Sequence, residues 1–126
     1  MQREINYNDV DWMAARCRGI STDLFFLEEE FLRARGLEFE LVRSVCFSCP
    51  IQRQCLEWAF ASNERYGMWG GVSGYERNAI RRKDFDNQFV SALKVQLEKY
   101  GVPFEEIIEA SEAKVVKNER SFAESD

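Results

Sequence analysis

The chain has 126 residues, a length that suits a single domain with a short extension. It carries 22 acidic and 17 basic residues, a net charge of −5 and a pI of about 4.9, which argues against a general nucleic-acid coat protein or a protein that binds anionic membranes. There is no histidine, which excludes catalysis by Ser–His or Cys–His pairs and excludes histidine as a metal ligand. We expect that the protein is not an enzyme.

No targeting or membrane segment is visible in the sequence. The longest apolar runs, such as residues 24–27 and 58–61, are far shorter than the ~20 residues of a membrane span. The first residues contain no apolar stretch of signal-peptide length. We therefore expect a soluble cytoplasmic protein with no membrane contact. Because cytoplasmic thiols are kept reduced, four cysteines indicate metal or redox chemistry before structural disulfides.

Helical patterns dominate the first half of the chain. Asp9 or Asp11 is a candidate cap for a first helix that carries Cys17. A second helix is expected over residues 24–35 and is closed by a glycine, with acids early and arginines late. A third is expected over residues 37–45, where apolar residues recur at helical spacing.

The second half is also predicted to be helical. Pro50 suits the first position of a helix over residues 50–64, because its missing N–H has no helical partner there. Ser73 and Glu76 have the spacing of a capping box, which predicts a helix that ends near residue 83.

Two further helices are expected over residues 86–100, which Gly101 stops, and over residues 103–116. No alternating pattern is long enough for a sheet. The predicted fold class is all-α, a small irregular helical bundle organised around the cysteines, with a domain at residues 1–83 and an acidic helical extension at residues 84–126.

The four cysteines are the strongest functional signal. Cys17 is followed by 28 intervening residues and then by the pattern Cys-x2-Cys-x5-Cys at Cys46, Cys49 and Cys55. A short Cys-x2-Cys loop can aim two sulfurs at one point. We expect Cys49 at a helix N-cap, where free N–H groups favour a thiolate. Because Cys17 comes from a separate segment, a bound metal would tie that segment to the centre of the chain.

Spacing alone leaves several interpretations open. Structural zinc also takes four thiolates, but zinc ribbons usually carry two Cys-x2-Cys knuckles and this chain has one, so zinc and iron–sulfur remain close to even. The thiols could also have no ligand, or could pair in three ways as disulfides after oxidation or cluster loss. A thiol–disulfide oxidoreductase using Cys46 and Cys49 is a further alternative, but the βαβ setting typical of such enzymes is missing.

Aromatic and basic residues form the remaining candidate sites. Three glycines within residues 67–71 predict a sharp turn that projects Trp69 outward. Four large aromatic residues are candidates either for core packing around a cluster or for a partner contact: Trp12, Phe25, Phe26 and Trp69. Residues 64–83 are the only segment with net positive charge. Its basic residues are candidates either for a solvated helix face or for phosphate contacts with nucleic acid: Arg77, Arg81, Arg82 and Lys83.

Several motifs occur in one order over roughly residues 9–83. They are Asp11-Trp12 with Cys17, then residues 23–26, then Cys46-x2-Cys49-Pro50-x4-Cys55-Leu56, then residues 67–71, then Glu76-Arg77 followed by Arg81-Arg82. This arrangement resembles the WhiB-like family of actinobacteria and their phages.

The resemblance implies a function. Members of the family are transcription regulators that bind a 4Fe–4S cluster through the four matching cysteines. Several dock on the C-terminal domain of the principal sigma factor, and the cluster responds to oxygen and nitric oxide. Residues matching Phe25, Phe26 and Trp69 help form the apolar sigma contact, and we add Trp12, Gly70 and Gly71 to that candidate surface.

The chain also departs from the family pattern. Met68 stands where relatives usually have Val or Ile, and Leu27 where they often have Pro. Many members carry a strongly basic tail that binds DNA, whereas residues 84–126 here have a net charge of −5. We therefore expect DNA binding by the isolated protein to be weak and the sigma factor to be the main partner.

Overall fold

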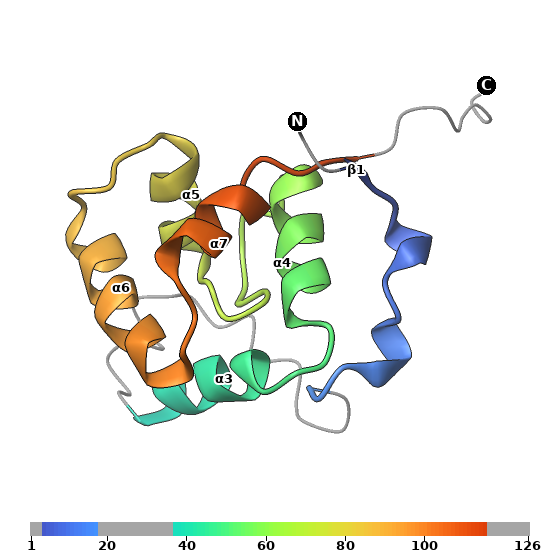
Figure 1. The fold of residues 1–126 in the computed structure, drawn as a ribbon, viewed down its shortest axis with the longest axis horizontal. Coiled ribbons are helices and arrows are strands. Elements are labelled where there is room, and N and C mark those ends of the chain that lie inside the picture. Colours follow the sequence, from blue (N-terminus) through green and yellow to red (C-terminus); the bar gives the residue numbers. More distant parts are fainter. Residues whose placement is uncertain (1–3, 18–36, 116–126) are drawn as a thin grey trace.

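The computed structural model describes residues 4–17 and 37–115 of the chain. Within these residues the fold is mostly helical, which confirms the predicted class in its broad form (Figure 1). None of the described helices is long and apolar enough to span a membrane. The elements in order are β1 (Glu4–Ile5), the 3₁₀ helices η1 (Tyr7–Asp9) and η2 (Trp12–Ala14), then α3 (Leu37–Phe47), α4 (Gln52–Ala61), α5 (Gly74–Arg81), α6 (Gln88–Tyr100), α7 (Phe104–Ala110) and β2 (Lys114–Val115).

The segment before Cys17 differs from the prediction. The expected first helix is wrong, because the chain forms two single 3₁₀ turns that are separated by extended backbone at Val10. Asn6 caps the first turn by accepting a hydrogen bond from the Asn8 amide at 2.9 Å, whereas the Asp11 side chain makes no cap bond. The helix expected over residues 24–35 lies outside the described residues.

The start of α4 also corrects an expectation. Residues 48–51 form a turn in which the Gln52 amide donates to the Cys49 carbonyl at 3.1 Å. The N-cap of α4 is therefore Ile51, and neither Pro50 nor Cys49 holds the expected position. At its other end α4 stops at Ala61 instead of residue 64, because Asn63 takes a left-handed conformation with φ of 61°.

The later helices follow the prediction until the last one. Ser73 and Glu76 form the expected capping box at the start of α5, and Gly101 ends α6 with φ of 68°. The last helix is shorter than expected, since α7 ends at Ala110. The chain then enters β2, which pairs in parallel with β1 in the register Glu4↔Lys114. This small sheet corrects the expectation that no strands form.

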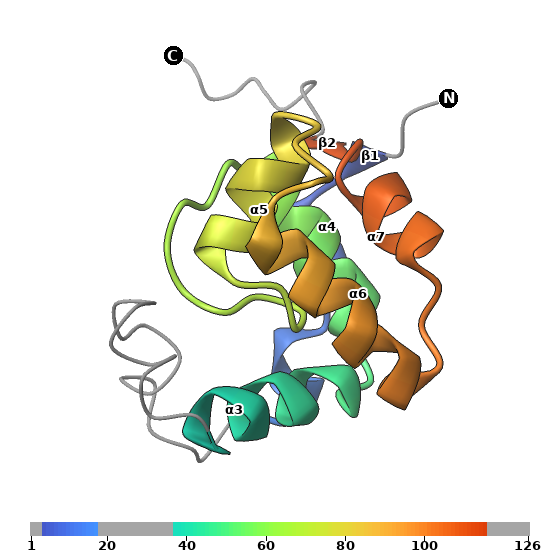
Figure 2. The ribbon, with the colours of Figure 1, turned by 90° about the vertical axis from the view of Figure 1, so that its left-hand side faces the viewer.

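The main core is shared by four helices, α4 to α7 (Figure 2). Leu93, Leu97 and Ile107 from the acidic extension are each at most 1% exposed. The extension thus packs on the rest of the protein, and the boundary at residue 83 stays a prediction. The buried residues of this core are Leu56, Phe60, Val72, Ala79, Ile80, Val90, Leu93, Leu97, Ile107 and Ala110.

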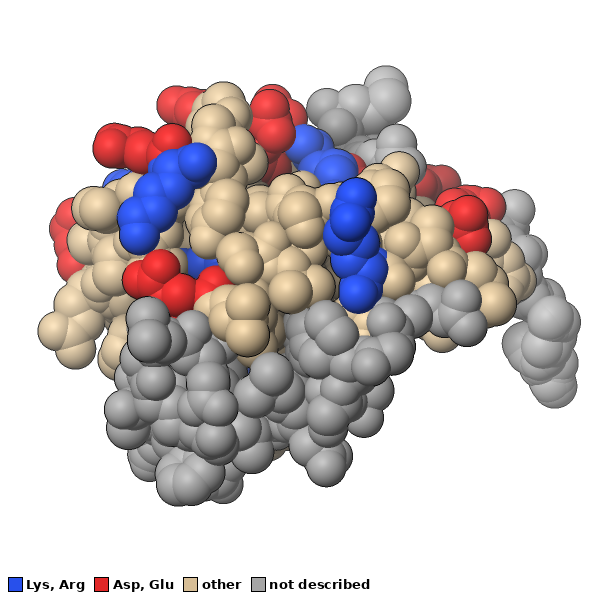
Figure 3. All heavy atoms as spheres, turned by 90° about the horizontal axis from the view of Figure 1, so that it is seen from below, with Lys and Arg blue, Asp and Glu red and all other residues tan. Residues whose placement is uncertain are grey.

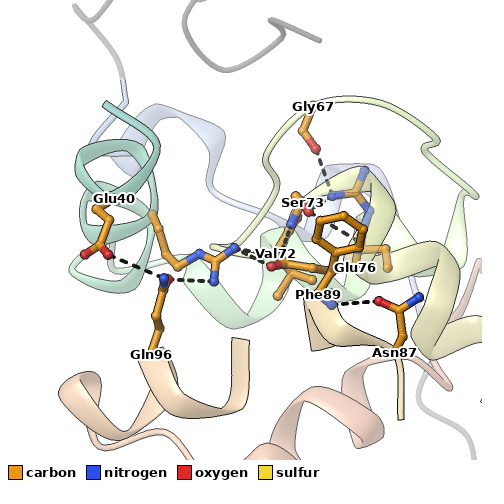
Figure 4. Close-up of polar contacts among 10 residues, drawn as sticks. Glu40, Gly67, Val72, Ser73, Glu76, Asn87, Phe89 and Gln96 are labelled. Atoms are coloured by element: carbon orange, nitrogen blue, oxygen red, sulfur yellow. Dashed lines mark hydrogen bonds and ion pairs between the residues drawn. The ribbon is translucent and has the colours of Figure 1, made fainter. Parts of the chain in front are cut away.

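A buried ion pair joins α3 to α5. One terminal nitrogen of the Arg43 guanidinium, Nη2, donates to both carboxylate oxygens of Glu76, at 2.7 and 2.6 Å, and both side chains are shielded from solvent. The other terminal nitrogen of Arg43, Nη1, donates to Gln96 at 2.8 Å, and Gln96 in turn donates to Glu40 (Figure 4). One polar network therefore fixes the helix that carries Cys46 against α5 and α6.

Candidate metal centre

All four cysteines line one cavity of about 210 Å³. Cys17 follows η2, Cys46 lies in the last turn of α3, Cys49 lies in the connecting turn, and Cys55 lies in the first turn of α4. The N-terminal segment, blue in Figure 1, ends beside the point where α3 passes into α4. The other lining residues are Trp12, Ala15, Val45, Ile51, Gln52, Met68, Trp69 and Gly70.

Local backbone bonds set the positions of the three clustered cysteines. The Cys49 amide donates to the Cys46 carbonyl at 3.1 Å, and the Cys55 amide donates to the Ile51 carbonyl at 2.8 Å. Ile51 is buried in the same apolar cluster as Cys49 and Cys55. Cys17 comes from the other side, and the Arg16 amide next to it donates to the Cys49 sulfur at 3.4 Å.

Burial sets the protonation state of the thiols. It raises the pKa of Cys46 and that of Cys55 to about 12, and the charges of the neighbouring cysteines add to both shifts. The pKa of Cys17 is also raised, first by burial and then by Cys49. The neutral thiol forms of Cys17, Cys46 and Cys55 are therefore favoured unless a cation compensates the charge of the thiolates.

The donor set consists of thiols alone. The chain has no histidine, and the walls between the cysteines are mostly apolar. In residues 4–17 and 37–115, no three Cys, Asp or Glu side chains lie close enough together to hold a single metal ion. Four thiols around one cavity are compatible with a larger thiolate-bound group.

The glycine turn packs directly on α4 and on the cysteines. Gly70 and Gly71 have φ of 59° and 87°, and both are buried. A Cβ at Gly70 would lie 2.6 Å from the Cβ of Leu56 and 2.8 Å from the Gln52 carbonyl oxygen. The backbone N–H of Gly71 lowers the pKa of Cys46 and that of Gly70 lowers the pKa of Cys55, which opposes the effect of burial.

This packing gives Gly70 and Gly71 a role that the sequence-based expectation of a partner contact did not include. Met68 also points inward, with 5% of its surface exposed, and packs in one cluster with Val42 and Cys46. Its flexible side chain fills apolar space, as expected for a residue that replaces Val or Ile.

Trp12 and Trp69 both line the cavity and contact each other. Their rings meet edge to face with centroids 6.2 Å apart, and both residues are half-buried. The Trp69 indole N–H donates to the Tyr66 carbonyl and the Trp12 indole N–H to the Tyr7 carbonyl, each at 3.0 Å. Trp69 thus lies along the wall and does not project freely. Phe25 and Phe26 lie outside the described residues.

The structure corrects the expectation for Arg77. Its side chain is 0% exposed, so it cannot contact a phosphate. Its guanidinium donates to four main-chain carbonyls of the loop before α5, those of Glu64, Tyr66, Gly67 and Val72. Arg77 therefore holds the glycine turn in place, a role that its sequence position next to other basic residues concealed.

The other three basic candidates are exposed but are held by neighbours to different degrees. Arg81 donates to the Phe60 carbonyl at 3.2 Å, and Arg82 lies 3.7 Å from Asp84. Lys83 lies just after the end of α5 and has φ of 61°. On the face that Figure 3 draws, basic side chains are interspersed with acidic side chains and uncharged surface. A nucleic-acid contact stays a prediction.

The fold and the site define a small helical protein with a four-cysteine centre. Residues 12–80 match the family model described as "Transcription factor WhiB", which covers more than half of the chain. The chain therefore belongs to the WhiB family, and the resemblance seen in its motifs is confirmed. No solved structure matches it.

Its relatives are named as transcriptional regulators. The chain is 39% identical over 75 residues to the redox-responsive transcriptional regulator WhiB3 of Mycolicibacterium smegmatis, covering 58% of this chain and 78% of the relative. It is 39% identical over 72 residues to the transcriptional regulator WhiD of Streptomyces coelicolor, with coverage of 56% and 64%. It is 34% identical over 88 residues to the transcriptional regulator WhiB1 of Bifidobacterium longum, with coverage of 69% and 95%. General transcription regulation is therefore supported for this chain.

Proposed function

We propose that this protein is a cytoplasmic iron–sulfur transcription regulator, not an enzyme, which acts by binding the C-terminal domain of the principal sigma factor. A 4Fe–4S cluster held by Cys17, Cys46, Cys49 and Cys55 would stabilise it and allow a response to oxygen or nitric oxide. The single observation that carries the proposal is that Cys17 lines one cavity together with three cysteines from a distant part of the sequence.

The size of the cavity favours a cluster over a structural zinc ion. Zinc binds four thiolates at about 2.3 Å each, so the four sulfurs close around a single ion. The cavity here has about 210 Å³, whereas a single water-sized occupant needs only about 10–15 Å³. A group with several metal atoms would fill more of this space than one ion would.

The surrounding residues would serve such a cluster in two ways. The backbone N–H groups of Gly70 and Gly71 lower the pKa of Cys55 and Cys46, and such donors beside ligand sulfurs would tune the reduction potential of a cluster. Trp12 shields the cavity from water with Trp69. The cluster itself would supply the redox chemistry.

Metal analysis after anaerobic purification tests the proposal. We expect about four iron atoms per chain and broad absorption at about 400 nm, as four-cysteine clusters show. A colourless protein with one zinc would instead establish the structural zinc alternative. Cys17→Ala should lose the cluster, because no histidine can replace the missing thiolate. Reduction of insulin by the metal-free form would support the oxidoreductase alternative.

Exposed apolar side chains near the cavity support a sigma-factor contact there. Met13 and Tyr66 are 69% and 76% exposed, each close in sequence to one of the two tryptophans at the cavity wall. Trp69→Ala should weaken sigma-factor binding by ~30- to 1,000-fold, as truncation of an aromatic anchor does. Tyr75→Ala is the matched control, because Tyr75 is 52% exposed on α5 and does not line the cavity.

Affinity should be measured with cluster-loaded proteins of equal absorption. Wild-type affinity in Trp69→Ala would refute the sigma contact. If the free protein binds duplex DNA tightly instead, the exposed basic residues carry the function. Replacing Arg81 and Arg82 by Ala should then reduce the salt slope by about two units.

A further inference from the structure

The two ends of the described chain are joined by a backbone pairing. Glu4 and Ile5 of β1 pair in parallel with Lys114 and Val115 of β2. Figure 1 shows β1 beside the red β2 segment, and Figure 2 shows both strands at one end of α4. Both strands lie outside residues 12–80, the part that matches the family model. The pairing is therefore a feature of this chain beyond the family match.

Buried side chains lie beneath this pairing. Ile5 is 1% exposed, Val10 is 5% exposed and Ala113 is 4% exposed, and all three pack with Ile51 in one apolar cluster. That cluster also includes Cys49 and Cys55. The C-terminal segment thus shares one apolar cluster with two of the candidate ligands.

The segment from the pairing to Cys17 has little structure of its own. Residues 6–17 contain only the 3₁₀ turns η1 and η2, whose bonds reach two or three residues along the chain. Such turns are short and weak alone. Among the described residues, the Arg16 amide makes a bond from this segment to the centre, on the Cys49 sulfur. Trp12, Ala14 and Ala15 also pack against the apolar cluster that contains Ile5 and Ile51. The position of Cys17 therefore depends on these contacts and on what holds the start of the segment.

We propose that residues 113–115 are positioning residues for Cys17: together with β1 they form a clasp that holds the cysteine-bearing segment on α4. Ala113 supplies the buried contact, and β2 supplies the backbone partner. The acidic extension thereby contributes to the geometry of the four-cysteine centre without supplying a ligand. Only the consequence for a cluster rests on the proposed function; the clasp itself does not.

Hydrogen exchange in the full-length, reduced and metal-free protein tests the clasp. Ala113→Asn places a polar side chain in the buried contact, and Lys114→Asn places the same residue at the neighbouring exposed position. Ile107→Ala weakens the extension in the main core without touching the clasp. Ile5→Val is a milder second variant that removes one methylene beneath the pairing.

We expect Ala113→Asn to speed amide exchange over residues 9–16 by about tenfold or more relative to α6, which is local opening of one segment. Ile5→Val should speed exchange over residues 9–16 to a smaller degree, and Lys114→Asn should leave it unchanged. Ile107→Ala should speed exchange in α6 at least as much as over residues 9–16. If Ala113→Asn and Ile5→Val both leave residues 9–16 protected, or speed all regions equally, the clasp is refuted.

Iron release to a chelator gives the second measurement, made on anaerobically loaded full-length protein. The rate should rise about tenfold or more in Ala113→Asn and stay at the wild-type value in Lys114→Asn, as for other supports of metal ligands. Equal rates in the two variants would overturn the positioning of Cys17. If the wild type takes up no iron, the proposed function fails, while hydrogen exchange still decides the clasp.

Discussion

At the scale of single residues, the cysteines of the candidate centre differ in their exposure. Cys46 is buried and Cys17 is exposed, although both line the same cavity. Burial makes the thiolate form costly in the absence of a cation, and the N–H groups of the glycine turn offset only part of that cost. Metal binding should therefore be accompanied by proton release.

The raised pKa of Cys46 and of Cys55 predicts a stability loss at high pH in the reduced, metal-free protein. Each pKa rises from 9.0 to about 12 on folding, so the folded state keeps protons that the unfolded state loses. The contribution is fully present below pH 9 and declines as pH rises toward about 12. Urea unfolding across that window should show a steeper decline than in the double variant Cys46→Ala, Cys55→Ala. If the unfolding free energies of the wild type and the double variant declined in parallel with pH, the raised pKa values of Cys46 and Cys55 would be contradicted.

The buried ion pair leads to a second prediction at this scale. Glu76→Ala should lower the free energy of unfolding by about 3–5 kcal/mol, because it leaves the Arg43 charge buried without its carboxylate. Lys99→Ala removes an exposed ion pair to Glu40 and should cost at most about 1 kcal/mol. Chemical denaturation measures both. If both variants lost at most about 1 kcal/mol of unfolding free energy, solvent would have to reach the Arg43 guanidinium.

At the scale of elements, the glycine turn is defined by its contact with α4. Gly70 and Gly101 share a left-handed backbone, with φ of 59° and 68°. They differ in surroundings, because a Cβ at Gly101 meets nothing within 4 Å, whereas one at Gly70 meets the backbone of α4. Comparing substitutions at Gly70 and Gly101 therefore separates the free-energy cost of the left-handed backbone from the cost of a clash with α4.

We predict that Gly101→Ala lowers stability by about 1 kcal/mol, the conformational cost alone. Gly70→Ala should lower it by several times as much, because overpacking adds about 1–3 kcal/mol or more. It should also shift the absorption of a bound cluster, since the turn carries the N–H groups that lower the pKa of Cys46 and Cys55. Thermal unfolding and absorption spectra measure the two effects. Equal stability losses would mean that the turn moves freely away from α4.

At the scale of the whole molecule, the extension completes the core. Val90, Leu93, Leu97 and Ile107 are each at most 1% exposed and pack with Leu56 in one cluster. Burial of each such side chain contributes ~1.5–3 kcal/mol, so their sum is comparable to the ~5–15 kcal/mol stability of a whole domain.

A chain truncated after residue 83 should therefore fail to fold in the metal-free state. Circular dichroism should show a large loss of helix, and amide resonances should lose their dispersion. A truncated chain that melts cooperatively near the wild-type temperature would contradict a shared core. That result would instead support residues 1–83 as an independent domain.

The sequence alone determined the features that depend on neighbouring residues. The capping box of Ser73 and Glu76 and the stop at Gly101 are local, because the partners lie within a few residues. The spacing of the cysteines and the order of the motifs were also sufficient to predict the family.

Only the tertiary structure decided what depends on contacts between distant residues. Arg77 looks in the sequence like part of a basic surface, but carbonyls up to 13 residues away accept its hydrogen bonds and bury it. The pairing of Glu4 with Lys114 leaves no pattern in the sequence, because two-residue strands are too short to alternate. The convergence of Cys17 with the other three cysteines on one cavity could be expected from the family, but it is a contact between distant residues that only the tertiary structure shows.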